Sequence, residues 1–206
     1  MLIGITGKKR SGKNTVADFM LEWAEEHSLP ARQQAFADKL KLSAARAFGF
    51  TNDHDGMSFC EDLKESGTVS VFFSTTTADV PDRLDVPDRL EVSGREFLQF
   101  YGTEAHRQMF GDRFWIERLL PKDLDHTKEL LIITDARFSN EAEAIRAVGG
   151  DIIRVVRFGS DEDGHASEKP LAEDLVDIEI LNDRDLDGLR WAARTAVERL
   201  YSQWLS

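Results

Sequence analysis

A glycine-rich segment near the amino terminus has the residue types and spacing of a phosphate-binding loop. In Gly7-Lys-Lys-Arg-Ser-Gly-Lys-Asn14, two glycines enclose four residues and a lysine follows the second glycine. Glycines allow backbone amides to turn towards phosphate oxygens, and Lys13 would reach the β and γ oxygens of a nucleoside triphosphate. A glycine turn with chance lysines is the alternative. The strand-like residues before the loop and the helical pattern after it favour the phosphate loop.

The position after Lys13 departs from the usual loop pattern. A serine or threonine hydroxyl there normally ligates Mg²⁺, but this chain has Asn14. An amide oxygen can ligate Mg²⁺ or hold one of its waters. Thr15 is no direct substitute, because adjacent helical residues point about 100° apart. We therefore predict an intact phosphate cradle with a changed set of metal ligands.

A second group of chemically capable residues follows an apolar run later in the chain. Asp135 and Arg137 come directly after Leu-Leu-Ile-Ile-Thr at 130–134, which reads as a buried strand. Parallel sheets present ligand-binding residues at the carboxyl ends of their strands. Asp135 would hold Mg²⁺ through water, and Arg137 would clamp a phosphate. A turn with only local hydrogen bonds is the alternative.

Three further arginines occupy positions that suit an anionic ligand. Arg107 lies one helical turn beyond Thr103 and so on the same face, although it could also be an ordinary solvated arginine. Arg154 and Arg157 lie on or near the strand that precedes residues 158–170, a polar stretch of lid-like composition. Closure of such a lid would bring an arginine onto a transferring phosphoryl group.

Strands and helices alternate along the chain, which predicts an α/β fold. The expected architecture is a mostly parallel central sheet with helices on both faces. The predicted strands are 2–6, 31–37, 129–134, 152–158 and 176–180. Helices are predicted after the loop, after residue 37, from 94, from 142 and from 186 to the carboxyl terminus.

Two helix starts carry capping patterns. Ser93-Gly-Arg-Glu96 has the spacing of a capping box, and the helix that it opens is expected to face Met109 inward. Asn140 and Glu143 are expected to cap a helix over 142–148.

We expect one domain over 1–206. Residues 51–92 are polar and rich in turns, and we interpret them as an insertion. The insertion contains a tandem duplication, Asp79-Val-Pro-Asp-Arg-Leu84 followed by Asp85-Val-Pro-Asp-Arg-Leu90. Two short copies with proline cannot form a solenoid, so a duplicated surface loop is the simplest interpretation and a substrate-covering loop the other.

Composition excludes several classes of function. A formal net charge of -12 disfavours nucleic acid and anionic membranes as partners. Cys60 is the only cysteine, so no intrachain disulfide is expected, and His165 lacks the companions of a zinc site. No run approaches the length of a membrane span. These features favour a reducing cytoplasm.

Taken together, the segments resemble the bacteriophage deoxynucleoside monophosphate kinases, a branch of the P-loop nucleotide kinases. The resemblance spans nearly the whole chain, and the matching stretches occur in the family's order. The family commonly has an acidic residue where this chain has Asn14. The matching stretches are residues 7–15, Ala35-Phe-Ala-Asp-Lys-Leu-Lys41, Leu98-Gln-Phe-Tyr-Gly-Thr-Glu-Ala-His-Arg107 with Phe114-Trp115, Ile133-Thr-Asp-Ala-Arg-Phe-Ser-Asn-Glu141, His165-Ala-Ser-Glu168 and Leu181-Asn-Asp183.

The resemblance implies an α/β P-loop kinase fold in one domain over 1–206, with residues 51–92 as an acceptor-side insertion and 158–170 as a lid. It implies a kinase that moves the γ-phosphoryl group of ATP to a deoxynucleoside monophosphate, with Mg²⁺, in nucleotide metabolism for phage DNA synthesis. It also implies a homodimer, located in the host cytoplasm if the chain is phage-encoded. The implied catalytic residues are Lys13, Asp135, Arg137 and Arg157, and the implied metal ligands are Asn14 and Asp135. The implied ATP site comprises Gly7, Lys8, Ser11, Gly12, Lys13, Asn14, Thr15 and Asn182. The implied acceptor site comprises Asp38, Lys41, Gln99, Thr103, Arg107, Trp115, Arg137 and Glu168.

Some of these assignments have structural alternatives. Trp115 lies between Phe114 and Ile116, a setting typical of core packing as well as of base stacking. Asp38 and Lys41 could be a surface ion pair three residues apart on a helix. Two other activities also fit the loop: a small-molecule kinase acting on dephospho-coenzyme A or phosphomevalonate, and a nucleotide-binding regulator that transfers nothing.

Overall fold

A computed structural model describes residues 1–72, 89–120, 128–157 and 171–205 of the chain. The chain divides into two compact units. Unit 1 comprises Met1–Ala37 and Trp115–Ser206, and unit 2 comprises Asp38–Phe114. Most of the segment predicted as an acceptor-side insertion therefore belongs to unit 2, whereas the lid-like stretch 158–170 lies outside the described residues.

Unit 1 is built on a five-stranded sheet in which every pair of neighbouring strands is parallel. The strand order is β2-β5-β1-β6-β7, so the chain leaves the central strand β1 towards one edge and later crosses to the other. Ligands of open parallel sheets bind where the strand order reverses in this way, at the carboxyl ends of the strands. The strands are β1 (Leu2–Thr6), β2 (Ala31–Gln34), β5 (Leu130–Ile133), β6 (Asp151–Val156) and β7 (Ile178–Leu181).

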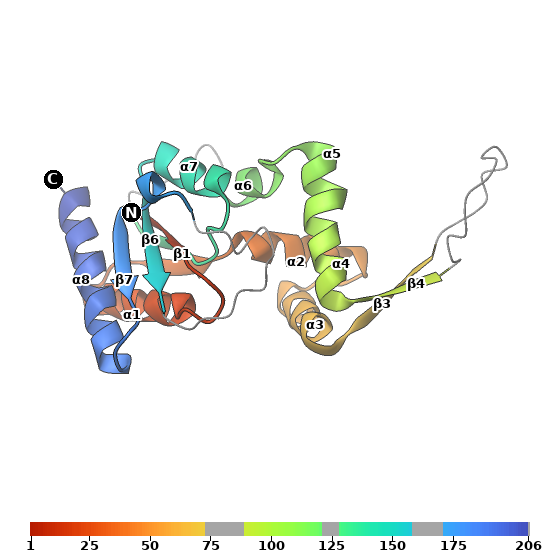
Figure 1. The fold of residues 1–206 in the computed structure, drawn as a ribbon, viewed down its shortest axis with the longest axis horizontal. Helices are drawn as coiled ribbons and strands as arrows, with labels where there is room; N and C mark the ends of the chain where they lie inside the picture. The colour runs from red at the N-terminus through yellow and green to blue at the C-terminus, as the bar shows by residue number, and fades with distance from the viewer. Residues whose placement is uncertain (73–88, 121–127, 158–170, 206) are drawn as a thin grey trace. The chain divides into compact units, whose positions relative to one another are not determined.

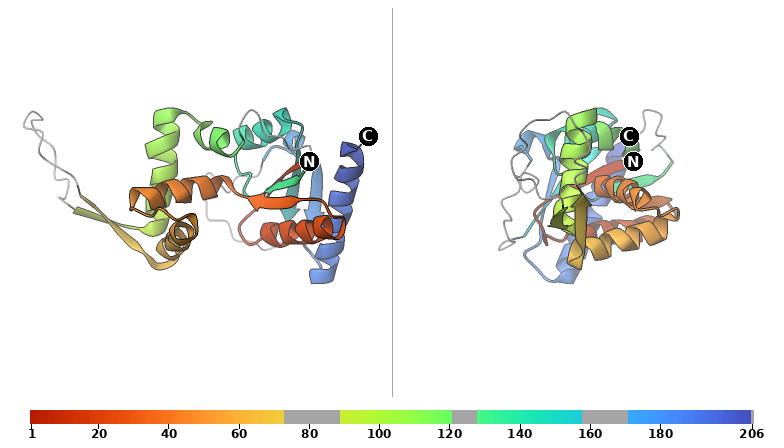
Figure 2. Two further views of the ribbon diagram at one scale, coloured as in Figure 1. Left: turned by 180° about the vertical axis from the view of Figure 1, so that it is seen from behind. Right: turned by 90° about the vertical axis from the view of Figure 1, so that its right-hand side faces the viewer.

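Helices cover both faces of this sheet (Figures 1 and 2). Alternate residues of one strand serve opposite faces: Ile3 packs with helices α1 (Lys13–Glu26) and α8 (Leu186–Trp204), and Leu2 packs with α6 (Phe114–Leu119) and α7 (Ser139–Ala147). The short 3₁₀ turn η3 spans Glu173–Leu175. Both faces are thus buried, which explains why these strands are almost continuously apolar.

Unit 2 consists of helices and a two-stranded antiparallel ribbon. Its small core contains Cys60 and Leu98, with partly buried aromatic rings packed against them. Figure 1 shows strands β3 and β4 as a ribbon that extends outward from the ends of α3 and α4. The elements are α2 (Phe36–Ala47, which begins in unit 1), α3 (Asp53–Ser66), β3 (Thr68–Phe72), β4 (Arg89–Ser93), α4 (Gly94–Gly102), the π-helical turn η1 (Thr103–Arg107) and α5 (Gln108–Phe110).

The predicted α/β fold with a parallel sheet covered on both faces is confirmed. The capping box is also confirmed, because Glu96 N–H donates to Ser93 Oγ and Ser93 N–H donates to Glu96. The expectation for Met109 is wrong, since its side chain is 72% exposed. The helical periodicity fails there because the π-helical turn shifts the register of every residue after it.

The cap predicted for α7 is also wrong. The helix begins at Ser139, and the acid that caps it is Glu141 rather than Glu143. Glu141 is buried, whereas Glu143 is exposed. The predicted start of the helix was too late because Glu141 and Glu143 lie two residues apart and either could be the capping acid. Only the burial of Glu141 distinguishes them.

Candidate functional site

The loop between β1 and α1 has backbone geometry that only glycine adopts readily at two positions. Gly7 has φ +147°, and a Cβ there would lie 2.4 Å from the carbonyl oxygen of Val155 on β6. Gly12 has φ +102°, and a Cβ there would lie 2.7 Å from Nδ2 of Asn182. Both glycines are therefore favoured by their positive φ, Gly7 also by the close approach of the Val155 backbone and Gly12 by that of the Asn182 side chain.

Lys13 lies in the first turn of α1 with its ammonium group against the loop. Its Nζ donates to the carbonyl oxygens of Gly7, at 2.7 Å, and Lys8, at 2.6 Å. Beside Gly7, Ser11 is fully buried and its Oγ has no hydrogen-bond partner within the described part of the chain. A buried hydroxyl without a partner is unusual, so this cradle has a polar atom suited to a bound phosphate. Asn14 is exposed at the start of α1, and Thr15 is half-buried.

Asn182 links the loop to the end of β7, an edge strand of the described sheet. Its side-chain Nδ2 donates to the carbonyl oxygen of Ser11 at 2.8 Å, and its backbone N–H donates to Val156 at 2.7 Å. The residue directly follows β7. Its side chain thus contacts the loop itself, a contact that its predicted place in the ATP site did not specify.

Asp135 lies beyond the end of β5 and binds the start of α2. One carboxylate oxygen accepts from Phe36 N–H at 2.7 Å and the other from Ala37 N–H at 2.9 Å. These are amides at a helix N-terminus, which lack partners inside the helix and favour a negative charge. Asp135 is therefore a helix cap, and its predicted metal role has to be compatible with both contacts.

Arg137 is exposed on the turn between β5 and α7, and the buried carboxylate of Glu141 fixes that turn. Glu141 is 2% exposed, and its Oε2 accepts from the backbone N–H of Arg137 at 2.9 Å and of Phe138 at 3.1 Å. Glu141 was not among the predicted site residues. Its position three residues after Phe138, in the first turn of a helix, was the available signal.

Arg154 on β6 and Arg157 just after it differ in their surroundings. Arg154 is 8% exposed; its guanidinium forms an ion pair with Glu173 at 2.6 Å, lies 3.6 Å from Glu179 and donates to the carbonyl of Leu171. Arg154 thus has a structural role within unit 1. Arg157, by contrast, is exposed just after the strand ends. Of the two, only Arg157 is placed to approach a ligand.

Unit 2 contains five of the predicted acceptor-side residues. Lys41 forms ion pairs with Glu61 on α3 and, at 4.0 Å, with Asp38. Burial alone would raise the pKa of Glu61, but its hydrogen bonds and charge interactions with Lys41 and Lys64 lower it overall. Asp38 and Lys41 are half-buried, so the surface-pair interpretation is incomplete. The other three residues, Gln99, Thr103 and Arg107, follow one another along α4 and η1.

Two predicted acceptor residues remain. Trp115 is 2% exposed and among the largest fully buried side chains, so the core interpretation accounts for its position. Base stacking by this ring stays a prediction. Glu168 lies outside the described residues.

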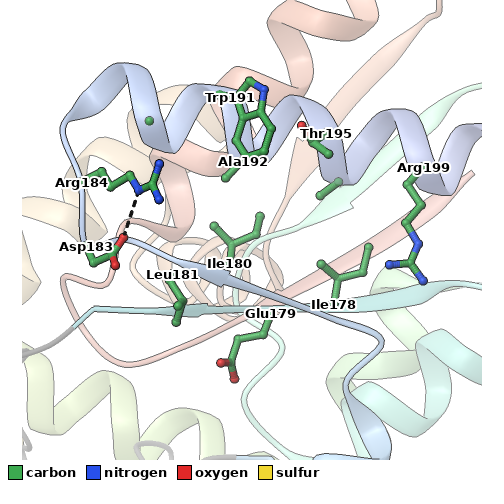
Figure 3. A pocket seen from close by; sticks show the side chains of 12 residues that line it. Ile178, Glu179, Ile180, Leu181, Asp183, Arg184, Trp191, Ala192, Thr195 and Arg199 are labelled. Atoms are coloured by element: carbon green, nitrogen blue, oxygen red, sulfur yellow. Dashed lines mark ion pairs between the residues drawn. The ribbon is translucent and has the colours of Figure 1, made fainter.

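A separate groove of about 310 Å³ runs along β7 and α8 (Figure 3). Its walls include Ile178, Ile180 and the indole of Trp191, which is 68% exposed. None of the predicted site residues line it. The groove is therefore distinct from the phosphate loop.

Within the described part of the chain, no cluster of three or more acidic, histidine or cysteine side chains could hold a metal ion by itself. Among these residues there is also no helix with the length and apolarity needed to cross a membrane. Mg²⁺ bound mainly by phosphate and water would need only one or two protein ligands, which is compatible with Asn14.

The parallel sheet with a glycine loop and lysine after its central strand defines a P-loop kinase fold. Comparison with known proteins then identifies the family: residues 63–192, more than half of the chain, match the profile of the deoxynucleotide monophosphate kinases. The chain belongs to the deoxynucleotide monophosphate kinase family, and it is thereby a kinase of nucleotide monophosphates.

Individual relatives agree with this family. The chain is 26% identical to a protein of Acanthamoeba polyphaga mimivirus provisionally named as a deoxynucleotide monophosphate kinase, over 100% of this chain and 95% of the relative. It is 25% identical to the deoxynucleoside-5'-monophosphate kinase of Escherichia phage T5, over 71% and 72% of the two chains. It is also 25% identical to the deoxynucleotide monophosphate kinase of Enterobacteria phage T4, over 91% and 95%.

Proposed function

We propose that this kinase transfers the γ-phosphoryl group of ATP to a deoxynucleoside monophosphate, giving a deoxynucleoside diphosphate and ADP. The observation that carries the proposal is the loop at residues 7–14, whose glycine geometry, buried Ser11 hydroxyl and inward Lys13 ammonium fit a triphosphate. The loop opens at the carboxyl end of the central strand, where the strand order reverses. Family membership supplies the acceptor class.

The chemistry requires positive charge and alignment rather than a general base. The acceptor is a phosphate with a second pKa near 6, so it is largely a dianion at neutral pH. Loop amides and Lys13 would orient the β and γ phosphates, and Arg137 and Arg157 would stabilise the charge on the transferred group. Asn182 holds the loop through Ser11, and Glu141 holds the turn that carries Arg137.

The residues present also fit a magnesium ion bound with ATP. Asn14 would offer an amide oxygen from the first turn of α1, and Asp135 would hold a metal-bound water while its oxygens cap α2. Bound Mg²⁺ would neutralise charge on the β and γ phosphates. Asn14 and Asp135 would lie beside those oxygens.

The direct test is an ADP-release assay with ATP and Mg²⁺. The acceptors are dAMP, dCMP, dGMP, dTMP, their ribose counterparts and dephospho-coenzyme A, and Lys13→Ala is the inactive control. We expect turnover with one or more deoxynucleotides and a loss of about 100-fold or more in Lys13→Ala. If dephospho-coenzyme A alone were phosphorylated, the proposed deoxynucleotide acceptor would be wrong. Measurable ATP binding without transfer to any acceptor would favour a regulator.

We further propose that the enzyme acts as a homodimer on small nucleotides in the cytoplasm, without nucleic-acid partners. The groove along β7 and α8 offers a self-complementary face, because β7 is an edge strand of the described sheet. Asp183 and Arg184 lie at one end of the groove and Arg199 at the other (Figure 3). Antiparallel pairing of two copies of β7 would place Arg199 opposite the partner's Asp183.

Light scattering after size exclusion tests this face at micromolar concentration. We expect a dimer for the natural chain and a monomer for Trp191→Glu, with Leu205→Glu as an exposed apolar control that remains dimeric. A monomeric natural chain would overturn the dimer. A dimeric Trp191→Glu would assign the interface to another surface.

A further inference from the structure

The π-helical turn η1 aligns three acceptor-side residues of unit 2. Gln99, Thr103 and Arg107 recur every four residues along α4 and η1. In a continuous α-helix, each interval of four residues rotates the side chain by about 40°, so Arg107 would lie about 80° round from Gln99. In a π-helical turn, with roughly 4.4 residues a turn, the second interval of four residues instead rotates the side chain by about 30° in the opposite sense. The net rotation from Gln99 to Arg107 is then only about 10°. The three side chains therefore leave the helix in nearly the same direction.

His106 holds this turn from the side. Its Nδ1 lies 2.6 Å from the carbonyl oxygen of Tyr101, and because a carbonyl oxygen can only accept, Nδ1 carries the proton. The imidazole ring packs 4.3 Å from the ring of Tyr101 and 5.0 Å from that of Phe114, centroid to centroid. It is thus held by this hydrogen bond and by its aromatic neighbours.

The same contact chain reaches the other helix of unit 2 that carries acceptor candidates. Tyr101 Oη lies within hydrogen-bond distance, 3.0 Å, of Ser43 Oγ on α2. Asp38 and Lys41 lie on that helix. His106, Tyr101 and Ser43 therefore connect the turn carrying Thr103 and Arg107 with the helix carrying Asp38 and Lys41.

We propose that His106 is a positioning residue of the acceptor site. It acts by holding the π-helical turn so that Arg107 faces the same way as Thr103 and Gln99, and it takes no part in proton transfer. The inference rests on the proposed function, because it presumes that Arg107 contacts the acceptor phosphate. It adds a residue and a backbone feature that the assignment of acceptor contacts did not include.

Two substitutions separate the hydrogen bond from the packing. His106→Phe keeps an aromatic ring but removes the Nδ1 donor, whereas His106→Asn restores an amide donor at the position of Nδ1. We expect KM for the deoxynucleotide to rise about tenfold in His106→Phe, with KM for ATP within twofold of the natural enzyme. Part of the loss should be recovered in His106→Asn. His54→Phe is the matched control, because His54 also belongs to unit 2 but its side chain is 91% exposed.

A double-mutant cycle with Arg107→Ala tests whether His106 acts through Arg107. The double variant His106→Phe with Arg107→Ala should have the same KM for the deoxynucleotide as Arg107→Ala alone. Thermal unfolding of each variant is measured beside the kinetics. A general loss of structure would lower the melting temperature and change KM for ATP as well as KM for the deoxynucleotide.

The outcomes distinguish this inference from the proposed function. If the natural enzyme phosphorylates no deoxynucleotide, the proposed function fails before the variants are compared. If it does, an unchanged KM in His106→Phe, or effects of His106→Phe and Arg107→Ala that multiply in the double variant, would overturn the role of His106. A bell-shaped pH profile of kcat that loses one limb in His106→Asn would also overturn it, since that result would indicate proton transfer.

Discussion

The two units of the molecule build their candidate sites in different ways. In unit 1 the loop, Asp135, Arg137, Arg157 and Asn182 all follow the carboxyl ends of parallel strands, and several are held by backbone hydrogen bonds. In unit 2 the candidate residues are held by side-chain contacts, such as Lys41 with Glu61 and His106 with Tyr101. A sheet edge fixes positions through the backbone, whereas side-chain contacts leave more to individual residues. Substitutions should therefore act more severely in unit 1 and more selectively in unit 2.

The most severe effect is expected where the loop leaves no room for a side chain. Gly7→Ala places a Cβ 2.4 Å from Val155 O at a φ of +147°, so the loop has to shift. We expect ATP affinity to fall about 100-fold or more, measured by calorimetry. Gly49→Ala in unit 2 is the control, because Gly49 also has positive φ but has open space around it. Comparable loss of ATP binding in both variants would contradict the dependence on close approach.

Asp135→Asn tests a contact that combines a cap with a predicted metal role. Replacing the carboxylate removes the negative charge at the start of α2, and we expect the free energy of unfolding to fall by about 1–2 kcal/mol. The Mg²⁺ concentration for half-maximal rate should rise as well, because the carboxylate is proposed to hold a metal-bound water. An unchanged Mg²⁺ requirement would leave Asp135 as a helix cap alone.

Glu141→Gln tests whether the buried carboxylate of Glu141 fixes the turn that carries Arg137. The neutral amide accepts more weakly from the N–H groups of Arg137 and Phe138, so we expect kcat to fall severalfold and stability by about 1 kcal/mol. The control is Glu143→Gln, two residues further on the same helix but exposed. Equal kinetics for the two variants would remove Glu141 from the site.

The smallest effect is expected for the ion pairs of unit 2, as a dependence of stability on pH. The folded-state pKa of Glu61 is below its ordinary value near 4.5, so its stabilising contribution is present above that value. The contribution is lost as pH falls through the folded-state pKa. Because Glu61 is partly exposed, we expect only a few tenths of a kcal/mol.

Urea unfolding between pH 6 and pH 3 measures this contribution. Glu61→Gln should be less stable than the natural chain at pH 6 and should show a shallower loss of stability on acidification. Asp62→Asn, an exposed neighbour, is the control. A difference between Glu61→Gln and the natural chain that grows below pH 4 would contradict the sign of the pKa change.

Much of unit 1 could be predicted from local sequence. The apolar runs of β1 and β5 are long enough to require burial on both sides of a sheet, and Val16, Phe19, Met20 and Trp23 share one helical face that is buried as predicted. The loop was recognisable because the spacing of its glycines and of the lysine after them is a local pattern. Glycine is the residue that adopts the backbone conformation of such a loop. These signals depend on residues near one another in the chain.

Other features depended on contacts between distant residues. The hydrogen bond between Asp135 and Phe36 joins residues 99 positions apart, and that between Asn182 and Ser11 joins residues 171 positions apart. The choice of Glu141 over Glu143, and the exposure of Met109, followed from burial and from the π-helical turn. No local pattern contains this information, because each case is decided by which neighbour the fold brings close.

The sequence by itself therefore determined the class of the fold and the glycine loop after the first strand, since these follow from periodicity and from the backbone limits of glycine. The tertiary structure alone decided which carboxylates cap helices, which arginine is buried in ion pairs and which turn aligns Gln99, Thr103 and Arg107. The physical reason is that burial and hydrogen-bond partners depend on the packing of elements far apart in the chain.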